Sequence, residues 1–167
     1  MSEIKIRLLT SEDWGIWKSI RLEMLKQVPE AFGSSFEDEV LRSDTDWQDS
    51  LKKSDIFGVF QGGDLVGTAG IFYHQQTKLQ HKAGLFAVYI QSQYRGSGLA
   101  GKLIATIIED VKTKALQLYC AVVVGNTSAL KLYQHHGFVQ IGIEPRALKV
   151  GDKFYDEILM VRALDEK

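Results

Sequence analysis

Short stretches of alternating apolar and polar residues open the chain, and apolar stretches rich in β-branched and aromatic residues recur through its middle and end. Both patterns are typical of β-strands. Strands are predicted at Ile4–Leu8, Ile56–Gln61, Leu65–Tyr73, Ala83–Ile90, Leu118–Val124, Phe138–Ile143 and Phe154–Arg162. The segment Gly62-Gly63-Asp64, between the second and third of these, predicts a hairpin turn.

Apolar residues three or four positions apart predict helices between the strands. The first helix follows Thr10 and Ser11, which can cap its N-terminus, and it stops before Pro29. A central helix has one apolar face, formed by Leu99, Leu103, Ile107 and Val111. Further helices are expected at Ser34–Leu41, Thr45–Lys53 and Asn126–Gly137.

The elements follow the order β-α-α-β-β-β-α-β-α-β-β, with one β-α-β crossover between runs of antiparallel strands. This order indicates an α+β fold, a mixed but mostly antiparallel central sheet of about seven strands flanked by about four helices. A doubly wound parallel sheet is not expected. The length of 167 residues fits a single domain spanning residues 1–167.

Composition and charge argue against several classes of function. The formal net charge is −1 without any run of Lys or Arg, so no nucleic-acid partner is expected, because such a partner requires a basic face. No apolar run approaches the ~20 residues that span a bilayer, and no signal peptide is recognisable, so no membrane association is expected. Cys120 is the only cysteine, which favours a reducing, cytoplasmic location. No metal site is expected.

The strongest chemical signal is a glycine-rich segment between the strand Ala83–Ile90 and the central helix. It contains Gly96, Gly98 and Gly101. Glycines let the backbone turn tightly and approach a ligand, and a helix N-terminus presents unpaired N–H groups at a positive dipole end. The segment therefore predicts a binding site for a pyrophosphate.

Two nucleotide patterns match this segment incompletely. The glycines satisfy the dinucleotide pattern G-x-G-x-x-G, but they lie several residues beyond the strand, and the next strand ends without an acidic residue. Gly96–Lys102 nearly satisfies the triphosphate pattern G-x-x-x-x-G-K-[ST], but Leu103 stands where a hydroxyl must hold magnesium. The glycines could also have a purely structural role, as a tight connection between the strand and the helix.

A third pattern fits throughout. Gln93-x-x-Gly96-x-Gly98 resembles the acyl-coenzyme A signature of the GNAT superfamily of N-acetyltransferases, and Asn126–Phe138 resembles that family's next motif, N-x-x-A-x-x-x-Y-x-x-x-G-F. The resemblance implies an N-acetyltransferase that moves an acetyl group directly from acetyl-coenzyme A to a primary amine of a small molecule or peptide. Its partners would be acetyl-coenzyme A and the amine, and the protein would be a monomer or a homodimer.

The resemblance also implies which residues hold the cofactor, in an opening between two strands. Backbone groups for the pantetheine arm would come from Ala87, Val88, Tyr89 and Ile90. The pyrophosphate end would be held by Gln93, Arg95, Gly96, Ser97, Gly98, Leu99, Ala100 and Gly101. The other side of the opening would be formed by Asn126, Ala129 and Tyr133.

Tyr133 matches the family's catalytic tyrosine, and its hydroxyl could protonate or hydrogen-bond the departing sulfur. The base that deprotonates the amine stays open. Some family members carry a Glu on the strand before the glycine segment, but Ala83–Ile90 contains no carboxylate. Water could relay the proton to Glu30, Glu37 or Tyr89. Because the transfer is direct, no thiol nucleophile is required.

Phe32, Phe36 and Glu37 place aromatic rings beside a carboxylate, a combination that could hold a cationic amine. The competing interpretation is a solvated helix face.

Two alternatives to the enzyme remain, a module that binds acyl-coenzyme A without turnover and a dinucleotide-binding oxidoreductase.

Overall fold

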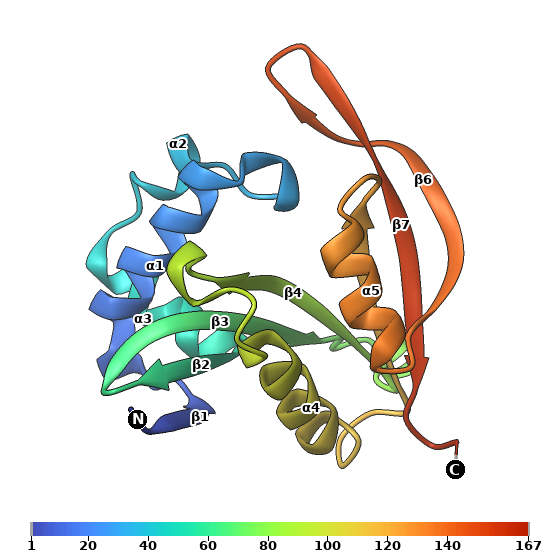
Figure 1. The fold of residues 1–167 in the computed structure, drawn as a ribbon, viewed down its shortest axis with the longest axis horizontal. Coiled ribbons are helices and arrows are strands. Elements are labelled where there is room, and N and C mark those ends of the chain that lie inside the picture. Colours follow the sequence, from blue (N-terminus) through green and yellow to red (C-terminus); the bar gives the residue numbers. More distant parts are fainter. Residues whose placement is uncertain (1, 167) are drawn as a thin grey trace.

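A computed structural model describes residues 2–166 as one seven-stranded sheet with helices on both faces (Figure 1). The strands are β1 (Ile4–Leu8), β2 (Asp55–Gln61), β3 (Asp64–Tyr73), β4 (Lys82–Ile90), β5 (Gln117–Val123), β6 (Val139–Val150) and β7 (Lys153–Ala163). The helices are α1 (Trp14–Gln27), α2 (Phe36–Glu39), α3 (Asp44–Lys53), α4 (Leu99–Val111) and α5 (Thr127–His135).

Neighbouring strands follow the order β1-β2-β3-β4-β5-β7-β6. All pairs are antiparallel except β4 and β5, which run parallel because the chain crosses over through α4 between them. The sheet is mixed and mostly antiparallel, which confirms the predicted α+β fold. Five helices are present in the described chain, against about four expected, and the helix predicted at Ser34–Leu41 is reduced to the single turn α2.

Each face of the sheet carries its own apolar cluster. On one face lie α4 and α5, where Leu103 and Ile107 of α4 are fully buried in the same cluster as Val59 of β2. On the other face lie α1 and α3, where Met24 and Trp47 are fully buried. Burial of an aliphatic side chain contributes about 2 kcal/mol. The apolar stripe of α4 therefore anchors that helix, and with it the glycine segment at its N-terminus.

The two ends of α5 are set by residues that the sequence indicated. Asn126 Oδ1 accepts a hydrogen bond of 3.2 Å from the amide of Ala129, and so caps the N-terminus. Gly137 follows the last helical turn with a φ of +84°, a left-handed conformation that favours glycine. A Cβ at Gly137 would also collide with the guanidinium of Arg162.

One strand differs markedly from its predicted bounds. β6 continues to Val150 instead of ending at Ile143. Pro145 lacks an N–H, and the pairing of β6 with β7 is irregular between Glu144 and Leu148. The chain bulges there: Arg146 takes a φ of +51°, and its amide donates a hydrogen bond of 2.8 Å to Asp156 Oδ1. β6 and β7 consequently form a long hairpin that projects beyond α5 (Figure 1).

The helices are short, and α1 with 14 residues is the longest. Across residues 2–166, none has the length and apolar character needed to cross a membrane. In the same range, no three His, Cys, Asp or Glu side chains are grouped so that they could hold a metal ion.

Candidate active site

The opening between β4 and β5 arises because the two strands pair only briefly. Lys82–Gly84 of β4 pairs with Gln117–Tyr119 of β5, and beyond these residues the strands diverge. A bulge bends β4 further, since Ala87 takes a φ of +53° and one extra residue of β4 stands opposite β3 there. Beyond Gly84 the facing backbone edges pair with no strand of the described chain, so they are available to an extended ligand.

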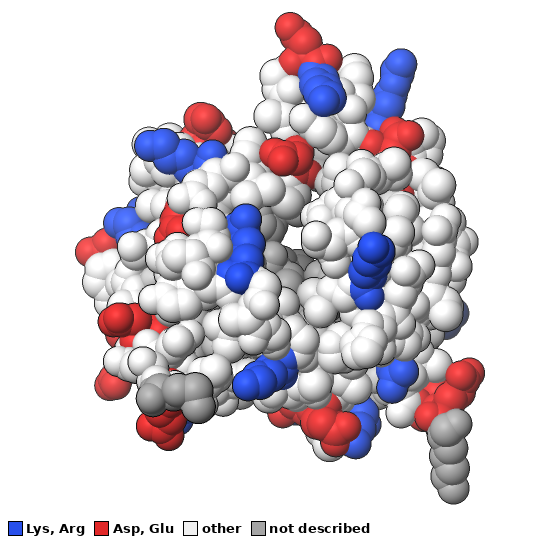
Figure 2. All heavy atoms as spheres, viewed as in Figure 1, with Lys and Arg blue, Asp and Glu red and all other residues white. Residues whose placement is uncertain are grey.

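An open cavity of about 320 Å³ occupies this divergence. Its walls come from β4, β5, α5 and β7, together with Arg21 of α1 and the segment after α1. Figure 2 shows a hollow between the surface over α1 and β4 and the surface over α5, with Lys or Arg side chains on both sides. Among the residues predicted to contact the cofactor, the wall contains Ala87, Val88, Asn126, Ala129 and Tyr133.

The glycine segment enters α4 with unpaired amides. Gly96 and Gly98 have φ values of +77° and +83°, and α4 begins at Leu99. Within residues 2–166, the amides from Gly96 to Gly101 donate no hydrogen bond, whereas the next amide, that of Lys102, donates to the Gly98 carbonyl at 3.1 Å. A Cβ on Gly96 or Gly98 would meet no atom within 4 Å, so both α-carbons border open space. The arrangement fits an anion.

Polar side chains fix this segment to the end of β4. Arg95 Nε donates a hydrogen bond of 2.8 Å to the Ile90 carbonyl. Ser97 Oγ donates one of 2.5 Å to a carbonyl of the preceding 3-10 turn, Ser92–Tyr94. Gln93, in the same turn, is exposed. The unpaired amides are therefore held in place before any ligand binds, which lowers the cost of binding.

Tyr133 reaches the cavity from α5. Its side chain is only 6% exposed and packs against Phe138, with the ring centroids 5.4 Å apart. Burial, and then the neighbouring Cys120, raises the pKa of Tyr133, so its hydroxyl stays protonated at neutral pH. Among residues 2–166 this hydroxyl has no hydrogen-bond partner. It is thus free to donate a hydrogen bond into the cavity.

Cys120 is buried on β5, as its apolar surroundings in the sequence indicated. Burial raises the pKa of its thiol to about 12. Because the thiolate is the nucleophilic form, a thiol with this pKa is unreactive at neutral pH.

Tyr89, one of the possible bases, lies in a hydrogen-bond network with α1. Its hydroxyl lies 3.0 Å from Glu23 Oε1 and 3.0 Å from Gln27 Oε1, and Gln91 Nε2 donates to Glu23 Oε2 at 2.9 Å. Burial, and then the hydrogen bond to Glu23, raises the pKa of Tyr89 to about 12. A phenol already donating its proton to a carboxylate is a poor base. The side chains of Tyr89 and Ile90 are both buried, so only their backbones can face a ligand.

The predicted acceptor residues are not all brought together. Phe32 lies on the cavity wall, whereas Phe36 and Glu37 of α2 do not. The charged residues on the wall are instead Arg21 and Glu157. Nothing in the sequence distinguished Glu157, because its place on the wall follows from the register of β7 against β5, in which it lies opposite Val123.

The chain resembles several known acetyltransferases. The sequence model of the Acetyltransferase (GNAT) family matches residues 17–138. Spermine/spermidine N(1)-acetyltransferase of Bacillus subtilis is 32% identical over 87 residues, which span 48% of this chain and 57% of that relative. A GNAT-family acetyltransferase from Streptococcus pneumoniae has a TM-score of 0.85 at 24% identity, covering 96% of this chain and 99% of that one. The yncA protein of Salmonella typhimurium, solved with its cofactor acetyl-CoA, has a TM-score of 0.85 at 16% identity, covering 99% and 96%.

These likenesses agree with the fold. The family match includes both the glycine segment and the Asn126–Phe138 segment, and the solved structures share the whole arrangement of strands and helices. The mostly antiparallel sheet also differs from the parallel, doubly wound sheet of dinucleotide-binding domains. The chain therefore belongs to the GNAT family of acetyltransferases.

Proposed function

We propose that this chain, as a single domain over residues 1–167, transfers an acetyl group from acetyl-coenzyme A directly to a primary amine. The observation that carries the proposal is the run of unpaired amides from Gly96 to Gly101, set beside the opening between β4 and β5. The first amides of any α-helix lack an intrahelical partner, and here Gly96 and Ser97 extend that unpaired run into the segment before α4.

The unpaired amides suit the pyrophosphate of coenzyme A. They lie at the N-terminus of α4, where the helix dipole adds to their positive potential. Arg95, tied to the Ile90 carbonyl, adds a full positive charge next to the segment. Basic side chains on both sides of the hollow would also raise the rate at which an anionic ligand arrives (Figure 2).

The pantetheine arm would lie in the divergence between the strands. The unpaired edge of β4 at Ala87 and Val88 offers backbone donors and acceptors, as an edge strand does to a peptide. Asn126 and Ala129 form the opposite wall. A ligand laid along this edge from the α4 amides would bring its thioester to Tyr133.

Tyr133 would stabilise the departing sulfur. Tyr133 lines the cavity, and its protonated hydroxyl has no partner in the described part of the chain, so it could donate to the charge that develops on sulfur as the C–S bond breaks. An amine acceptor is supported by the curated relatives, which are named for acetylation of spermine and spermidine. The cytoplasmic location and the monomeric or homodimeric state stay predictions.

The alternative is a module that binds acyl-coenzyme A without turnover. Measuring both cofactor binding and acetyl transfer distinguishes the enzyme from such a module. We expect acetyl-coenzyme A, but neither NAD nor ATP, to raise the melting temperature of the protein. We also expect release of free thiol when acetyl-coenzyme A is mixed with a panel of primary amines. Stabilisation without thiol release would favour the module, and no response to acetyl-coenzyme A at millimolar concentration would reject both.

A further inference from the structure

Glu157 is the carboxylate on the cavity wall. It lies on β7, where it pairs with Val123 of β5 on one side and with Glu144 of β6 on the other. Of the described residues that line the cavity, it alone carries a carboxyl group. Its side chain is partly buried, so any charge it bears is only partly hydrated.

The charge of Glu157 is not compensated within the protein. No Lys, Arg or His among residues 2–166 lies within 4 Å of its carboxylate. The one cation on the wall, Arg21, is held by Glu39 at 2.8 Å. Burial, and then Glu144, raises the pKa of Glu157, which shows that its surroundings oppose the anion. A cation brought into the cavity would relieve that cost.

A second group points to the same place. Tyr133, only 6% exposed, lines the same cavity, and its hydroxyl has no hydrogen-bond partner among residues 2–166. A carboxylate that attracts cations and a hydroxyl that donates hydrogen bonds thus share one cavity. Phe32 and Phe86 also line this cavity, and their apolar rings suit the methylene groups of an alkyl chain.

We propose that Glu157 binds the ammonium group of the acceptor and takes its proton, so that the site selects primary alkylamines over amines that carry a nearby carboxylate. This inference rests on the proposed acetyl transfer. It assigns the base that the sequence left open, and it places that base on β7 instead of on β4.

The carboxylate takes one proton from the ammonium group and leaves a neutral amine. The nitrogen lone pair then bonds to the thioester carbonyl carbon, and the C–S bond breaks with its electron pair on sulfur. The sulfur gains the hydroxyl proton of Tyr133, which is restored by the second proton that the nitrogen loses. Glu157 releases its proton to water, so the products are the acetylated amine, the free thiol and one proton.

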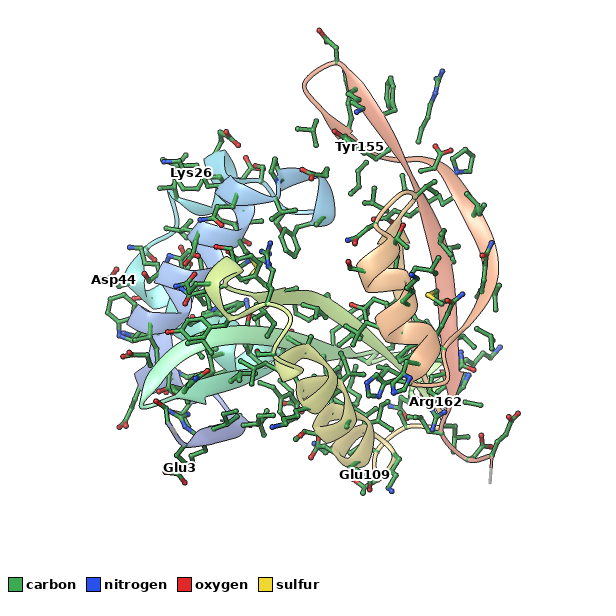
Figure 3. All side chains as sticks on the ribbon, in the orientation of Figure 1. Glu3, Lys26, Asp44, Glu109, Tyr155 and Arg162 are labelled. Atoms are coloured by element: carbon green, nitrogen blue, oxygen red, sulfur yellow. The ribbon has the colours of Figure 1, made fainter. Side chains whose placement is uncertain are left out.

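The test compares wild type with Glu157→Gln and with the control Glu109→Gln. Glu109 is exposed on α4, where it pairs with Lys112, and it lies at the end of α4 remote from the cavity (Figure 3). Both variants lose one carboxylate charge with little change in shape. The acceptors are 1,4-diaminobutane, butylamine and 4-aminobutanoate, which differ mainly in whether the far end is cationic, apolar or anionic.

We expect wild type to prefer the diamine and butylamine over 4-aminobutanoate in kcat/KM. Glu157→Gln should lower kcat/KM for the two alkylamines by about 100-fold, the usual range for loss of a general base, and leave the Kd for coenzyme A unchanged. Glu109→Gln should match wild type. Equal kcat/KM for Glu157→Gln and wild type, or a wild-type preference for 4-aminobutanoate, would overturn the inference.

The pH profile gives a readout that a purely structural role would not move. Among the described residues, Glu144 pairs with Glu157 across β6 and β7, and the other titratable groups on the cavity wall are Arg21 and Tyr133. With an ionised Glu157 acting on the ammonium form, wild-type kcat/KM should be flat between the raised pKa of that carboxyl and the amine pKa of ~10.4, and it should fall as the pH drops through the carboxyl pKa. In Glu157→Gln the amine must arrive neutral, so kcat/KM should climb about tenfold per pH unit toward the amine pKa of ~10.4. Identical profiles would also overturn the inference, whereas a wild type that transfers no acetyl group would instead refute the proposed function.

Discussion

Arg21 donates two hydrogen bonds to the carboxylate of Glu39, from Nε to Oε2 at 2.8 Å and from Nη2 to Oε1 at 3.1 Å. The pair joins α1 to α2 and is nearly removed from water, with Arg21 only 6% exposed. Because Arg21 also lines the cavity, the pair decides the charge of the site. With Glu39 in place the guanidinium is neutralised, and the uncompensated charge on the wall is that of Glu157.

Glu39→Gln should destabilise the protein by about 3 kcal/mol, because it leaves a buried guanidinium without a counter-charge. At this chain length the loss corresponds to a melting temperature lower by about 9 °C. Thermal melts followed by circular dichroism would measure it. Glu37→Gln, an exposed change in the same short helix, is the control and should melt within about 1 °C of wild type. Equal melting of both variants would show that the Arg21 pair adds nothing.

Gly98→Ala should weaken binding of coenzyme A. Gly98 has a φ of +83°, which costs an L-residue about 1–2 kcal/mol, so alanine would shift the amides of the glycine segment out of position. We expect the Kd, measured by titration calorimetry, to rise about tenfold, equivalent to 1.4 kcal/mol. Gly15→Ala is the matched control, because Gly15 lies in α1 with no atom near its missing Cβ, and it should bind as wild type does. Unchanged affinity of Gly98→Ala would remove the glycine segment from the binding site.

The features that the sequence predicted well are those in which local residues dictate local geometry. The glycines before α4 and the cap at Asn126 follow from backbone conformations that few residues adopt, so their positions could be read directly. The crossover between β4 and β5 followed from the central helix and the strands on either side of it. Of these features, β4, β5 and Asn126 contribute to the cavity wall.

The features that the sequence missed depend on pairing between distant segments. Glu157 comes to the cavity only because β7 lies beside β5 in one register, and a shift by one residue would turn its side chain to the opposite face. The continuation of β6 past Pro145 depends on Asp156 of the neighbouring strand, whose carboxylate binds the Arg146 amide. Neither relationship can be recognised from the local sequence.

Cys120 should be inert in the folded protein. With its pKa at about 12, only about one thiol in 10,000 is ionised at pH 8, so alkylation should be at least ~1,000-fold slower than for an ordinary thiol of pKa ~8.5. The rate should increase about tenfold per pH unit until the pKa is reached, and unfolding in urea should abolish the protection. Mass spectrometry of iodoacetamide-treated protein measures both. Rapid labelling of the native protein at pH 8, or an acetylated Cys120 after exposure to acetyl-coenzyme A alone, would reopen a covalent mechanism.

Tyr133→Phe should lower kcat by at least tenfold while leaving the Kd for coenzyme A within about twofold, because the hydroxyl would act on the departing sulfur and not on the bound cofactor. Stability should not fall, since removing a hydroxyl that has no partner sacrifices no hydrogen bond. Tyr73→Phe is the control: its hydroxyl is buried without a partner among the described residues, and Tyr73 is not on the cavity wall. If Tyr73→Phe and Tyr133→Phe retained the same turnover as wild type, Tyr133 would be a core residue that happens to border the cavity. A loss confined to Tyr133→Phe, with unchanged melting temperatures in both variants, would tie the chemistry to that one hydroxyl.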